Sequence, residues 1–287
     1  MYAIVQSGQR PKAPVGESPE KVLEKHTRIT IDSIQEEPVV IKSYAITDIG
    51  QKRKLNQDFI YLSETPIGNL PNVFIVADGM GGHNAGDYAS RYAVEIVVEE
   101  ISNSLEKNPV RILGRAIDKA NRMIRERAQT DEHLNGMGTT MVIATCIGQY
   151  LEVANVGDSR LYVVNETIEQ VTRDHSLVEE MVRMGGIDRA SARNHPDKNI
   201  ITRAIGARDT VETDFFNLEL KPGDKILLCS DGLTNMVDDE EIHRVLTGEG
   251  TLKRSVEELV RLANQNGGKD NISAIVVEPL ADEVEHD

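Results

Sequence analysis

The chain has 287 residues, of which 39% are hydrophobic and 28% are charged, so it is long enough for one large core or two modest ones. Its formal net charge is -15, and it has no cluster of Lys and Arg that would mark a nucleic-acid-binding face. An acidic chain also disfavours anionic membranes, and no stretch has the apolar pattern of a membrane span or a signal peptide. The two cysteines, Cys146 and Cys229, lie inside apolar runs, so we expect reduced core residues and a cytoplasmic protein.

The first 38 residues differ in composition from the rest of the chain. They contain prolines and many charges but little hydrophobic periodicity. We therefore predict a polar, flexible N-terminal arm at 1–38, with a short helix at 18–23 and an extra strand at 29–34 as its regular elements. A short acidic tail at 281–287 follows the last predicted strand.

From residue 39 onward, hydrophobic periodicity predicts a regular series of elements. Apolar runs bounded by turn residues predict strands at 39–46, 59–62, 73–77, 139–147, 150–156, 160–164, 167–171, 211–218, 225–229 and 272–277. A period of 3.6 residues predicts helices at 85–105, 109–129, 177–184, 239–246 and 252–264. The strands are grouped and the helices come in pairs, which favours antiparallel sheets covered by helices, an α+β fold, over a parallel sheet.

Two of the predicted strands end in the dipeptide Asp-Gly. Asp78 and Gly79 follow the strand at 73–77, and Asp231 begins the second pair after the apolar run 226–230. A short apolar run closed by glycine predicts a buried strand that ends in a turn, so each carboxylate is expected at the mouth of the core. Because a buried carboxylate is costly without a partner, a cation or a metal ion is the usual compensation.

Other polar residues stand at similar positions near the ends of predicted strands. For Asp58, Asp158 or Asp270 taken alone, a role in a turn is the more common one. Converging carboxylates would repel one another unless neutralised, however, and hard oxygen ligands select Mg²⁺ or Mn²⁺. Arg53 is either a surface charge or a phosphate clamp, and His83 is either a surface residue near a helix start or a proton donor. Carboxylate-held metal ions beside an arginine suggest phosphate-ester chemistry.

The ordered set of these motifs resembles the metal-dependent protein serine/threonine phosphatases, type 2C, in their bacterial form. The segments that carry the resemblance are 47–58 (TDIGQKRKLNQD), 76–83 (VADGMGGH), 138–140 (GTT), 155–160 (NVGDSR), 174–176 (DHS), 230–233 (SDGL) and 269–271 (KDN). Each motif is weak by itself, but the set spans about Ser43 to Val277 in the right order and is very specific.

The resemblance implies a four-layer α-β-β-α sandwich of two antiparallel sheets flanked by helix pairs. The phosphatase domain would span 39–280, with a small flap near 185–202 beside the cleft. The resemblance also implies two Mn²⁺ or Mg²⁺ ions in a cleft between the sheets, with a third, weaker ion beside them.

The resemblance assigns metal-binding roles to the aspartates. Asp78 would bridge both ions, and the Gly79 carbonyl would bind the first. Asp231 and Asp270 would bind the second ion. Asp58 would support the site, either as a ligand itself or from behind one.

The remaining roles concern the third ion, the phosphate and the proton. Asp158 resembles the ligand of the third metal ion, and Arg53 resembles the phosphate-binding arginine. A water between the metal ions would attack phosphorus in line, with no phosphoenzyme. The chain departs from the pattern at two places: Gln57 stands where many relatives carry an acid, and Met80 stands where the animal enzymes have a histidine. The identity of the general acid, with His83 as one candidate, is therefore left open.

The expected function is a monomeric phosphatase that acts on phosphoserine and phosphothreonine of proteins and opposes a bacterial serine/threonine kinase. One alternative is a non-catalytic binding or sensor module that keeps the fold. Another two-metal phosphoesterase, such as a nuclease, is disfavoured by the absence of basic stripes and aromatic stacking platforms. A partner-switching phosphatase of an anti-sigma-antagonist protein keeps the chemistry and changes the substrate.

Overall fold

The computed structural model describes residues 41–82, 85–193 and 195–279. The predicted N-terminal arm at 1–38, with its short helix and extra strand, lies outside these residues, and so do His83 and the acidic tail at 281–287. Within the described part, no helix combines the length and the apolar character needed to cross a membrane.

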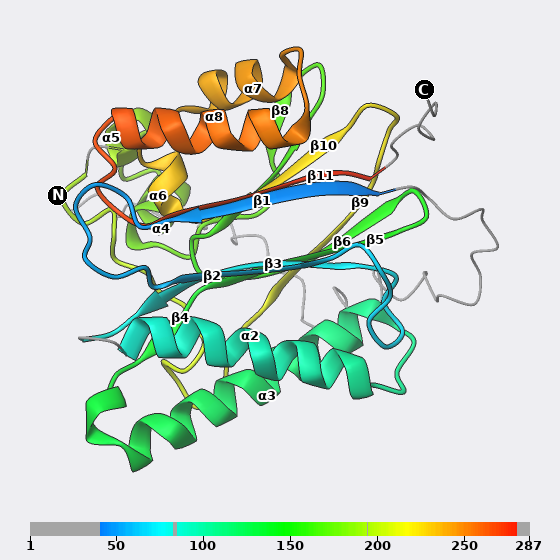
Figure 1. Ribbon diagram of the computed structural model, residues 1–287. Coiled ribbons are helices and arrows are strands. Elements are labelled where there is room, and N and C mark those ends of the chain that lie inside the picture. The colour runs from blue at the N-terminus through cyan, green and yellow to red at the C-terminus, as the bar shows by residue number, and fades with distance from the viewer. Residues whose placement is uncertain (1–40, 83–84, 194, 280–287) are drawn as a thin grey trace, which may run out of the picture.

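Two antiparallel sheets pack face to face in the middle of the molecule (Figure 1). The first sheet contains, in spatial order, β1 (Lys42–Asp48), β11 (Ile272–Glu278), β10 (Lys225–Cys229), β7 (Arg160–Val164) and β8 (Ile168–Gln170). The second sheet contains β2 (Asp58–Ser63), β3 (Val73–Met80), β5 (Met141–Ile147), β6 (Tyr150–Val156) and β9 (Asp214–Glu219), with β4 (Gly138–Thr139) paired to β3. The strand pairings are antiparallel in both sheets, as predicted.

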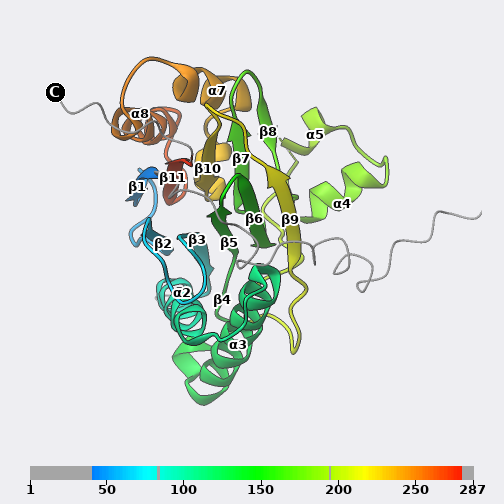
Figure 2. The same cartoon turned by 90° about the vertical axis from the view of Figure 1, so that its right-hand side faces the viewer.

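A pair of helices covers the outer face of each sheet, which completes the predicted four layers (Figures 1 and 2). The helices α2 (Ala85–Asn103) and α3 (Pro109–Thr130) pack on the second sheet, and α7 (Asp239–Thr247) and α8 (Leu252–Gln265) pack on the first. Helix α3 begins as predicted with Pro109, after Asn108, whose side chain accepts a hydrogen bond from the Arg111 N–H at 3.0 Å.

Three layers of buried apolar side chains lie between the four layers of backbone. One fills the space between the two sheets, and the other two lie under the helix pairs. The central strands are therefore covered on both faces, and almost every residue of β5, β10 and β11 is buried. This double burial explains why these strands are apolar throughout, instead of alternating with polar residues.

The segment predicted as a flap lies at the side of the sandwich (Figure 2). It follows α4 (Leu177–Arg183) and contains one short helix, α5 (Arg189–Arg193), where the sequence predicted only a loop. The Asp188 carboxylate accepts a hydrogen bond from the Ser191 N–H at 2.7 Å, so an aspartate cap starts this helix. The end of the flap is fastened to the chain before α4, because the Leu177 N–H donates to the Ile200 carbonyl at 2.8 Å.

Several predicted boundaries were wrong for identifiable reasons. Strand β3 continues through Asp78 and Gly79 to Met80, because Asp78 pairs with Asp58 of β2 and Gly79 pairs with Thr139 of β4. The predicted strand 139–147 is divided into β4 and β5, and β9 begins at 214 instead of 211.

Besides α5, two further short helices were not predicted from the sequence. The 3₁₀ helix η2 (Glu132–Leu134) follows α3 directly, and α6 (Asp231–Thr234) begins at the second Asp-Gly pair. Both are single turns, too short to show a hydrophobic period.

Candidate active site

A pocket of about 240 Å³ collects most of the predicted site residues. Its lining residues are Arg53, Gln57, Asp78, Gly79, Met80, Gly81, Thr140, Asp158, Asn199, Ile201, Asp231, Asp270 and Asn271. They come from the segment before β2, the end of β3, the residue between β4 and β5, the β6–β7 turn, the flap, α6 and the two residues before β11. The fold thus brings together residues from both sheets and from nearly the whole length of the domain.

Asp58 and Asp78 lie opposite one another on neighbouring strands. Two hydrogen bonds to Thr140 hold the Asp78 backbone: the Asp78 N–H donates to the Thr140 hydroxyl at 3.0 Å, and the Asp78 carbonyl accepts from the Thr140 N–H at 2.8 Å. Burial raises the pKa of Asp78 well above its ordinary value, and the nearby carboxylates of Asp58, Asp231, Asp158 and Asp270 raise it further.

Asp58 lies behind the pocket wall and is only 5% exposed. Its Oδ2 accepts hydrogen bonds from the hydroxyls of Ser230 and Ser273, both at 2.7 Å. Ser230 follows β10 and Ser273 belongs to β11, so the first sheet holds a carboxylate of the second. Burial raises the pKa of Asp58 to about 7, although the two hydroxyls act in the opposite direction. Within the part of the chain that the structure describes, its Oδ1 has no hydrogen-bond partner.

Close backbone packing requires glycine at two positions beside Asp78. The Gly79 N–H donates to the Gln57 carbonyl at 3.0 Å, and a Cβ on Gly79 would come within 2.0 Å of the Gly86 carbonyl oxygen. A Cβ on Gly86 would in turn meet the Gly79 carbonyl oxygen at 2.7 Å and the Gln57 amide at 2.5 Å. Gly86 was missed at the sequence level, because nothing in its local pattern reveals the backbone against which it packs.

Asp231 begins the short helix α6 directly after β10. Its Oδ2 accepts a hydrogen bond from the Asn235 side chain at 2.9 Å, whereas its buried Oδ1 has no hydrogen-bond partner among the described residues. Burial raises the pKa of Asp231 to about 6, and Asp270 contributes in the same direction, while Arg160 and Lys198 oppose the shift. Asn235 was not identified from the sequence.

Asp270 and Arg53 meet at the mouth of the pocket. The Arg53 guanidinium donates to the Asp270 Oδ2 at 2.7 Å, and the two side chains are 47% and 30% exposed. The neighbouring Asn271, which belongs to the motif at 269–271 but had no predicted role, holds the segment that carries Arg53. Its amide donates to the carbonyls of Ile49 and Leu55, both at 3.0 Å, and accepts from the Gln57 N–H at 2.9 Å.

Asp158 lines this pocket and also the neighbouring one, which is lined by a further carboxylate, Asp174. Burial raises the pKa of Asp158 well above its ordinary value, with Asp231 and Asp174 adding to the shift. Asp174 itself is clasped by Arg160, whose Nε and Nη2 donate to both carboxylate oxygens at 2.7 to 3.1 Å. The Gln170 amide adds a further hydrogen bond to Asp174 at 2.8 Å, so this carboxylate is satisfied by protein groups.

The residues around the pocket fit divalent cations. Asp58 and Asp231 each keep one buried oxygen without a partner, and the carboxylates raise one another's pKa because they converge in a buried place. In residues 41–82, 85–193 and 195–279, no group of three or more Asp, Glu, His or Cys side chains is arranged as a complete metal-binding set. Asp270 forms an ion pair with Arg53. Oxygen donors of this kind suit Mg²⁺ or Mn²⁺.

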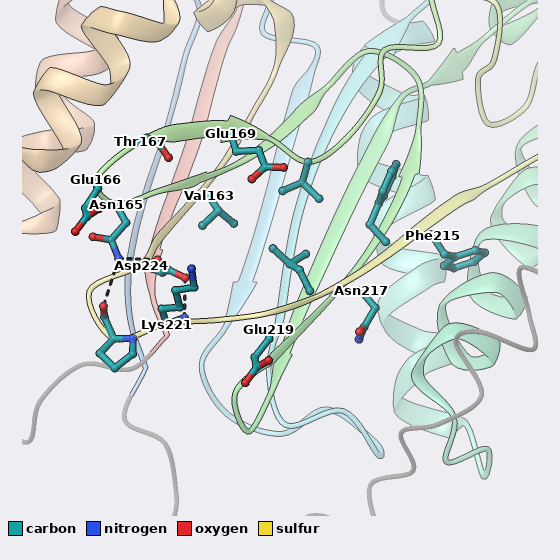
Figure 3. Close-up of a pocket in the computed structure, with 14 residues that line it drawn as sticks. Val163, Asn165, Glu166, Thr167, Glu169, Phe215, Asn217, Glu219, Lys221 and Asp224 are labelled. Atoms are coloured by element: carbon teal, nitrogen blue, oxygen red, sulfur yellow. Dashed lines mark hydrogen bonds between the residues drawn. The ribbon is translucent and has the colours of Figure 1, made fainter.

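A larger pocket of about 870 Å³ lies elsewhere, at the open side of the sandwich between β8 and β9 (Figure 3). Its carboxylates do not converge. Asp224 accepts hydrogen bonds from the Asn165 amide at 2.8 Å and from the Lys221 N–H at 2.7 Å, and Glu166, Glu169 and Glu219 are exposed to solvent. Because its acids are either satisfied or solvated, this pocket offers no catalytic constellation.

Comparison with known proteins agrees with the site and the fold. The model of the family described as protein phosphatase 2C matches residues 50–276. The serine/threonine phosphatase stp of Listeria monocytogenes is 42% identical over 237 residues, which are 81% of this chain and 93% of that protein. The solved serine/threonine phosphatase of S. agalactiae has a TM-score of 0.77 and 39% identity, and the match covers 83% of this chain and 99% of that one. The catalytic domain of the serine/threonine protein phosphatase PstP, solved in complex with 2 manganese ions, has a TM-score of 0.74 and 30% identity over 84% of this chain and 98% of that one.

The fold and the acidic pocket together define the class of a metal-dependent phosphatase. The chain belongs to the protein phosphatase 2C family, that is, to the metal-dependent protein serine/threonine phosphatases, in their bacterial form. The resemblance drawn from the motifs is therefore confirmed, and the protein is an enzyme. The alternatives of a non-catalytic module, a nuclease and a partner-switching phosphatase of an anti-sigma-antagonist protein gain no support from these relatives.

Proposed function

We propose that this phosphatase hydrolyses phosphoserine and phosphothreonine of proteins in the pocket lined by Asp78, Asp231 and Asp270. Two Mn²⁺ or Mg²⁺ ions would be its cofactors, and Arg53 would bind the phosphate. The observation that carries the proposal is a group of neighbouring carboxylates that raise one another's pKa, beside an exposed arginine. Among the described residues, Asp58 and Asp231 each keep one oxygen without a hydrogen-bond partner.

Arg53 is well suited to receive a phosphate. Its guanidinium makes a single hydrogen bond to Asp270 and is 47% exposed, so it can reach an incoming ligand. A planar guanidinium binds two phosphate oxygens at once, which a single lysine cannot do. When Arg53 exchanges its carboxylate partner for a phosphate, the Asp270 carboxylate becomes available to a cation.

The cations would be held by Asp78, the Gly79 carbonyl, Asp231 and Asp270, with Asp58 in support. Such cations supply two effects when bound, since they lower the pKa of a water and offset the negative charge on the phosphoryl group. The PstP relative solved with 2 manganese ions supports this choice of cofactor. A third, weaker ion at Asp158 is part of the proposal, since this buried carboxylate faces the same pocket.

Other residues of the chain would orient the metal-binding carboxylates and supply a proton to the departing oxygen. Thr140 fixes the backbone of Asp78, and Ser230 and Ser273 fix the carboxylate of Asp58, so both acids are held before any ligand binds. The departing seryl or threonyl oxygen needs a proton. We propose His83 as one candidate donor, with the solvent as the alternative.

The test is an assay of the purified full chain with Mn²⁺ on p-nitrophenyl phosphate and on a phosphothreonine peptide. We expect turnover of both substrates, and we expect EDTA or the change Asp231→Ala to abolish it. Activity that survives both treatments would refute the proposal. A parallel assay on single-stranded DNA should show no cleavage, since the lining residues include no aromatic side chain on which a base could stack.

We further propose that the enzyme works as a monomer in the cytoplasm, where it opposes a serine/threonine kinase. Its acidic net charge of -15 disfavours nucleic acid or an anionic membrane surface as a partner. Phosphoproteomics of a deletion strain tests this role, because the phosphothreonine sites that accumulate are the expected substrates. Comparing the full chain with a version that starts at Val39 tests whether the polar arm at 1–38 regulates the domain.

A further inference from the structure

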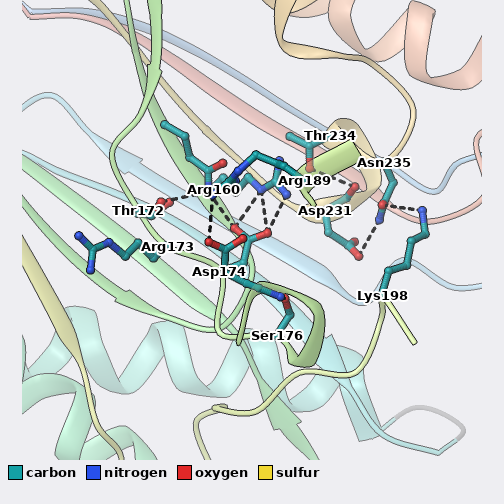
Figure 4. A network of polar contacts seen from close by, with 12 residues as sticks. Arg160, Thr172, Arg173, Asp174, Ser176, Arg189, Lys198, Asp231, Thr234 and Asn235 are labelled. Atoms are coloured by element: carbon teal, nitrogen blue, oxygen red, sulfur yellow. Dashed lines mark hydrogen bonds and ion pairs between the residues drawn. The ribbon is translucent and has the colours of Figure 1, made fainter. Parts of the chain in front are cut away.

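A chain of side-chain hydrogen bonds leads from the flap to the carboxylate of Asp231 (Figure 4). The Lys198 ammonium donates to the Asn235 Oδ1 at 2.9 Å, and the Asn235 Nδ2 donates to the Asp231 Oδ2 at 2.9 Å. Lys198 belongs to the flap, whereas Asp231 is the first residue of α6 and Asn235 is the C-terminal cap of that helix. These contacts connect a surface segment with a residue of the proposed metal site.

The orientation of the Asn235 amide is determined by its two neighbours. An ammonium group only donates hydrogen bonds and an ionised carboxylate only accepts them, so the amide oxygen must face Lys198 and the amide nitrogen must face Asp231. The backbone N–H of Asn235 also donates to the Asp231 carbonyl at 2.8 Å, which anchors it to the same residue a second time. Asn235 is therefore fixed at both its backbone and its side chain.

This arrangement leaves one atom of Asp231 for a cation. Oδ2 is engaged by Asn235, while Oδ1 is buried and has no partner. A carboxylate that is held through one oxygen presents the other in a defined direction. Groups that orient a ligand in this way usually affect metal affinity, although they never touch the metal.

The position of Lys198 is set by the flap and not by the helix to which it binds. The Leu177 N–H donates to the Ile200 carbonyl at 2.8 Å, and the Thr202 N–H donates to the His175 carbonyl at 2.8 Å. These bonds fasten the end of the flap just after Lys198, so the lysine is delivered to Asn235 by the fold of that segment. A displacement of the flap would remove the ammonium group from Asn235.

We propose that Lys198 is a positioning residue that acts through Asn235 on Asp231 and so couples the seating of the flap to divalent-cation binding. The inference rests on the proposed function of Asp231 as a metal ligand. By thermodynamic linkage the coupling is reciprocal, so cation binding also favours the flap conformation in which Lys198 contacts Asn235.

The experiment measures Mn²⁺ binding to the full chain by isothermal titration calorimetry, after treatment with EDTA and its removal. Lys198→Met removes the ammonium but keeps the side-chain length, and we expect the affinity to fall about tenfold, the lower end of what the loss of an orienting partner costs. Lys198→Arg keeps a charged donor and should recover most of the affinity. Lys253→Met is the matched control, because Lys253 lies on α8, is 62% exposed and forms an ion pair at 3.8 Å with another surface charge, Glu257.

A double-mutant comparison separates the relay from a simple charge effect. In the background Asn235→Ala, the further change Lys198→Met should cost no additional affinity, because the path to Asp231 is already broken. An equal loss in both backgrounds, or unchanged affinity in Lys198→Met, would overturn the proposal. Thermal unfolding checks that each variant is folded, and if Asn235→Ala is not, the comparison of Lys198→Met with Lys198→Arg still decides the outcome.

Kinetics on a phosphothreonine peptide give a second readout. Lys198→Met should raise the Mn²⁺ concentration needed for half-maximal activity and leave kcat at saturating Mn²⁺ nearly unchanged. A fall in kcat at saturating Mn²⁺, with unchanged Mn²⁺ dependence, would contradict a positioning role. Calorimetry requires no substrate, so a failure of the relay can be distinguished from a failure of the proposed phosphatase activity.

Discussion

Two arginine–aspartate pairs in this molecule use the same chemical groups in different ways. Arg160 clasps Asp174 with three hydrogen bonds of 2.7 to 3.1 Å, and the side chains are 26% and 13% exposed. Arg53 makes one hydrogen bond of 2.7 Å to Asp270, and these side chains are 47% and 30% exposed. The first pair is locked, and the second can exchange partners.

The difference between the pairs follows from their surroundings. Gln170 donates a further hydrogen bond to Asp174, and the Tyr162 hydroxyl accepts one from Arg160, so every part of the locked pair has a protein partner. Arg53 and Asp270 stand at the mouth of a pocket among other carboxylates, where a cation and a phosphate would each offer a better partner. We infer that the locked pair serves stability and that the loose pair serves binding.

The largest effect on activity should come from replacing Asp270, the acidic member of the loose Arg53–Asp270 pair. Asp270→Asn keeps the size of the side chain and its hydrogen bond from the Asn271 N–H but removes a charge that the cation needs. We expect kcat/KM on a phosphothreonine peptide to fall more than about 100-fold, beyond the usual cost of losing a group that only orients a ligand. The melting temperature measured in EDTA should not fall, and a clear loss of stability would contradict the assignment of Asp270 to binding.

Breaking the locked Arg160–Asp174 pair should lower the stability of the protein, which the Asp270 change should not do. Asp174→Asn leaves a largely buried guanidinium without its counter-charge, and we expect a loss of about 2 to 4 kcal/mol of unfolding free energy, at or below the range for a fully buried pair. Urea unfolding in EDTA measures this loss. The matched control Glu258→Gln breaks an exposed pair on α8 and should leave the midpoint unchanged.

Removing the arginine of the loose pair should produce a smaller, purely functional effect. Arg53→Ala should raise KM for the phosphopeptide about ten- to a hundredfold, since a hydrogen bond to a charged group contributes about 1.5 to 3 kcal/mol. Stability should stay the same, because exposed ion pairs contribute little. Steady-state kinetics beside a thermal unfolding curve test both halves of this expectation, and a stable enzyme with unchanged KM would contradict the phosphate-binding role.

The smallest expected effect is a pH dependence of the unfolding free energy that comes from the pocket carboxylates and not from the Arg160–Asp174 pair. Burial raises the pKa of Asp58 from 3.8 to about 7 and that of Asp231 from 3.8 to about 6. Because the folded protein binds these protons more tightly than the unfolded chain, its unfolding free energy in EDTA should decrease as the pH rises through this window. Mn²⁺ competes with the protons, so the stabilisation that it adds should grow over the same range.

Two variants show whether that pH slope belongs to the pocket. Asp231→Asn removes one of the shifted groups and should flatten the fall in melting temperature. Asp174→Asn should lower the melting temperature but keep the slope. An unchanged slope in Asp231→Asn would mean that other groups cause the pH dependence.

The two Asp-Gly pairs show what the local sequence predicted correctly about the backbone and what it did not. Both follow apolar runs, and both were predicted to stand where a buried strand ends in a turn. Asp78 is instead a strand residue, because β2 and β4 extend the ladder past it, whereas Asp231 begins a helical turn. The same dipeptide adopts two conformations. The strands β2 and β4 pair with Asp78 and Gly79, whereas β7 begins at Arg160, which pairs with Cys229, so its pairing with β10 ends two residues before Asp231.

The sequence by itself determined the class of elements, the grouping of strands, the family and most of the acids around the pocket. These follow from hydrophobic periods and from motifs that are local or ordered along the chain. Only the tertiary structure revealed Gly86 against Gly79, Asn271 beneath the Arg53 segment, and the path from Lys198 through Asn235 to Asp231. The reason is physical: a close contact, a hydrogen bond or a locked ion pair depends on distances between segments that are remote in sequence, and these distances exist only once the two sheets have packed.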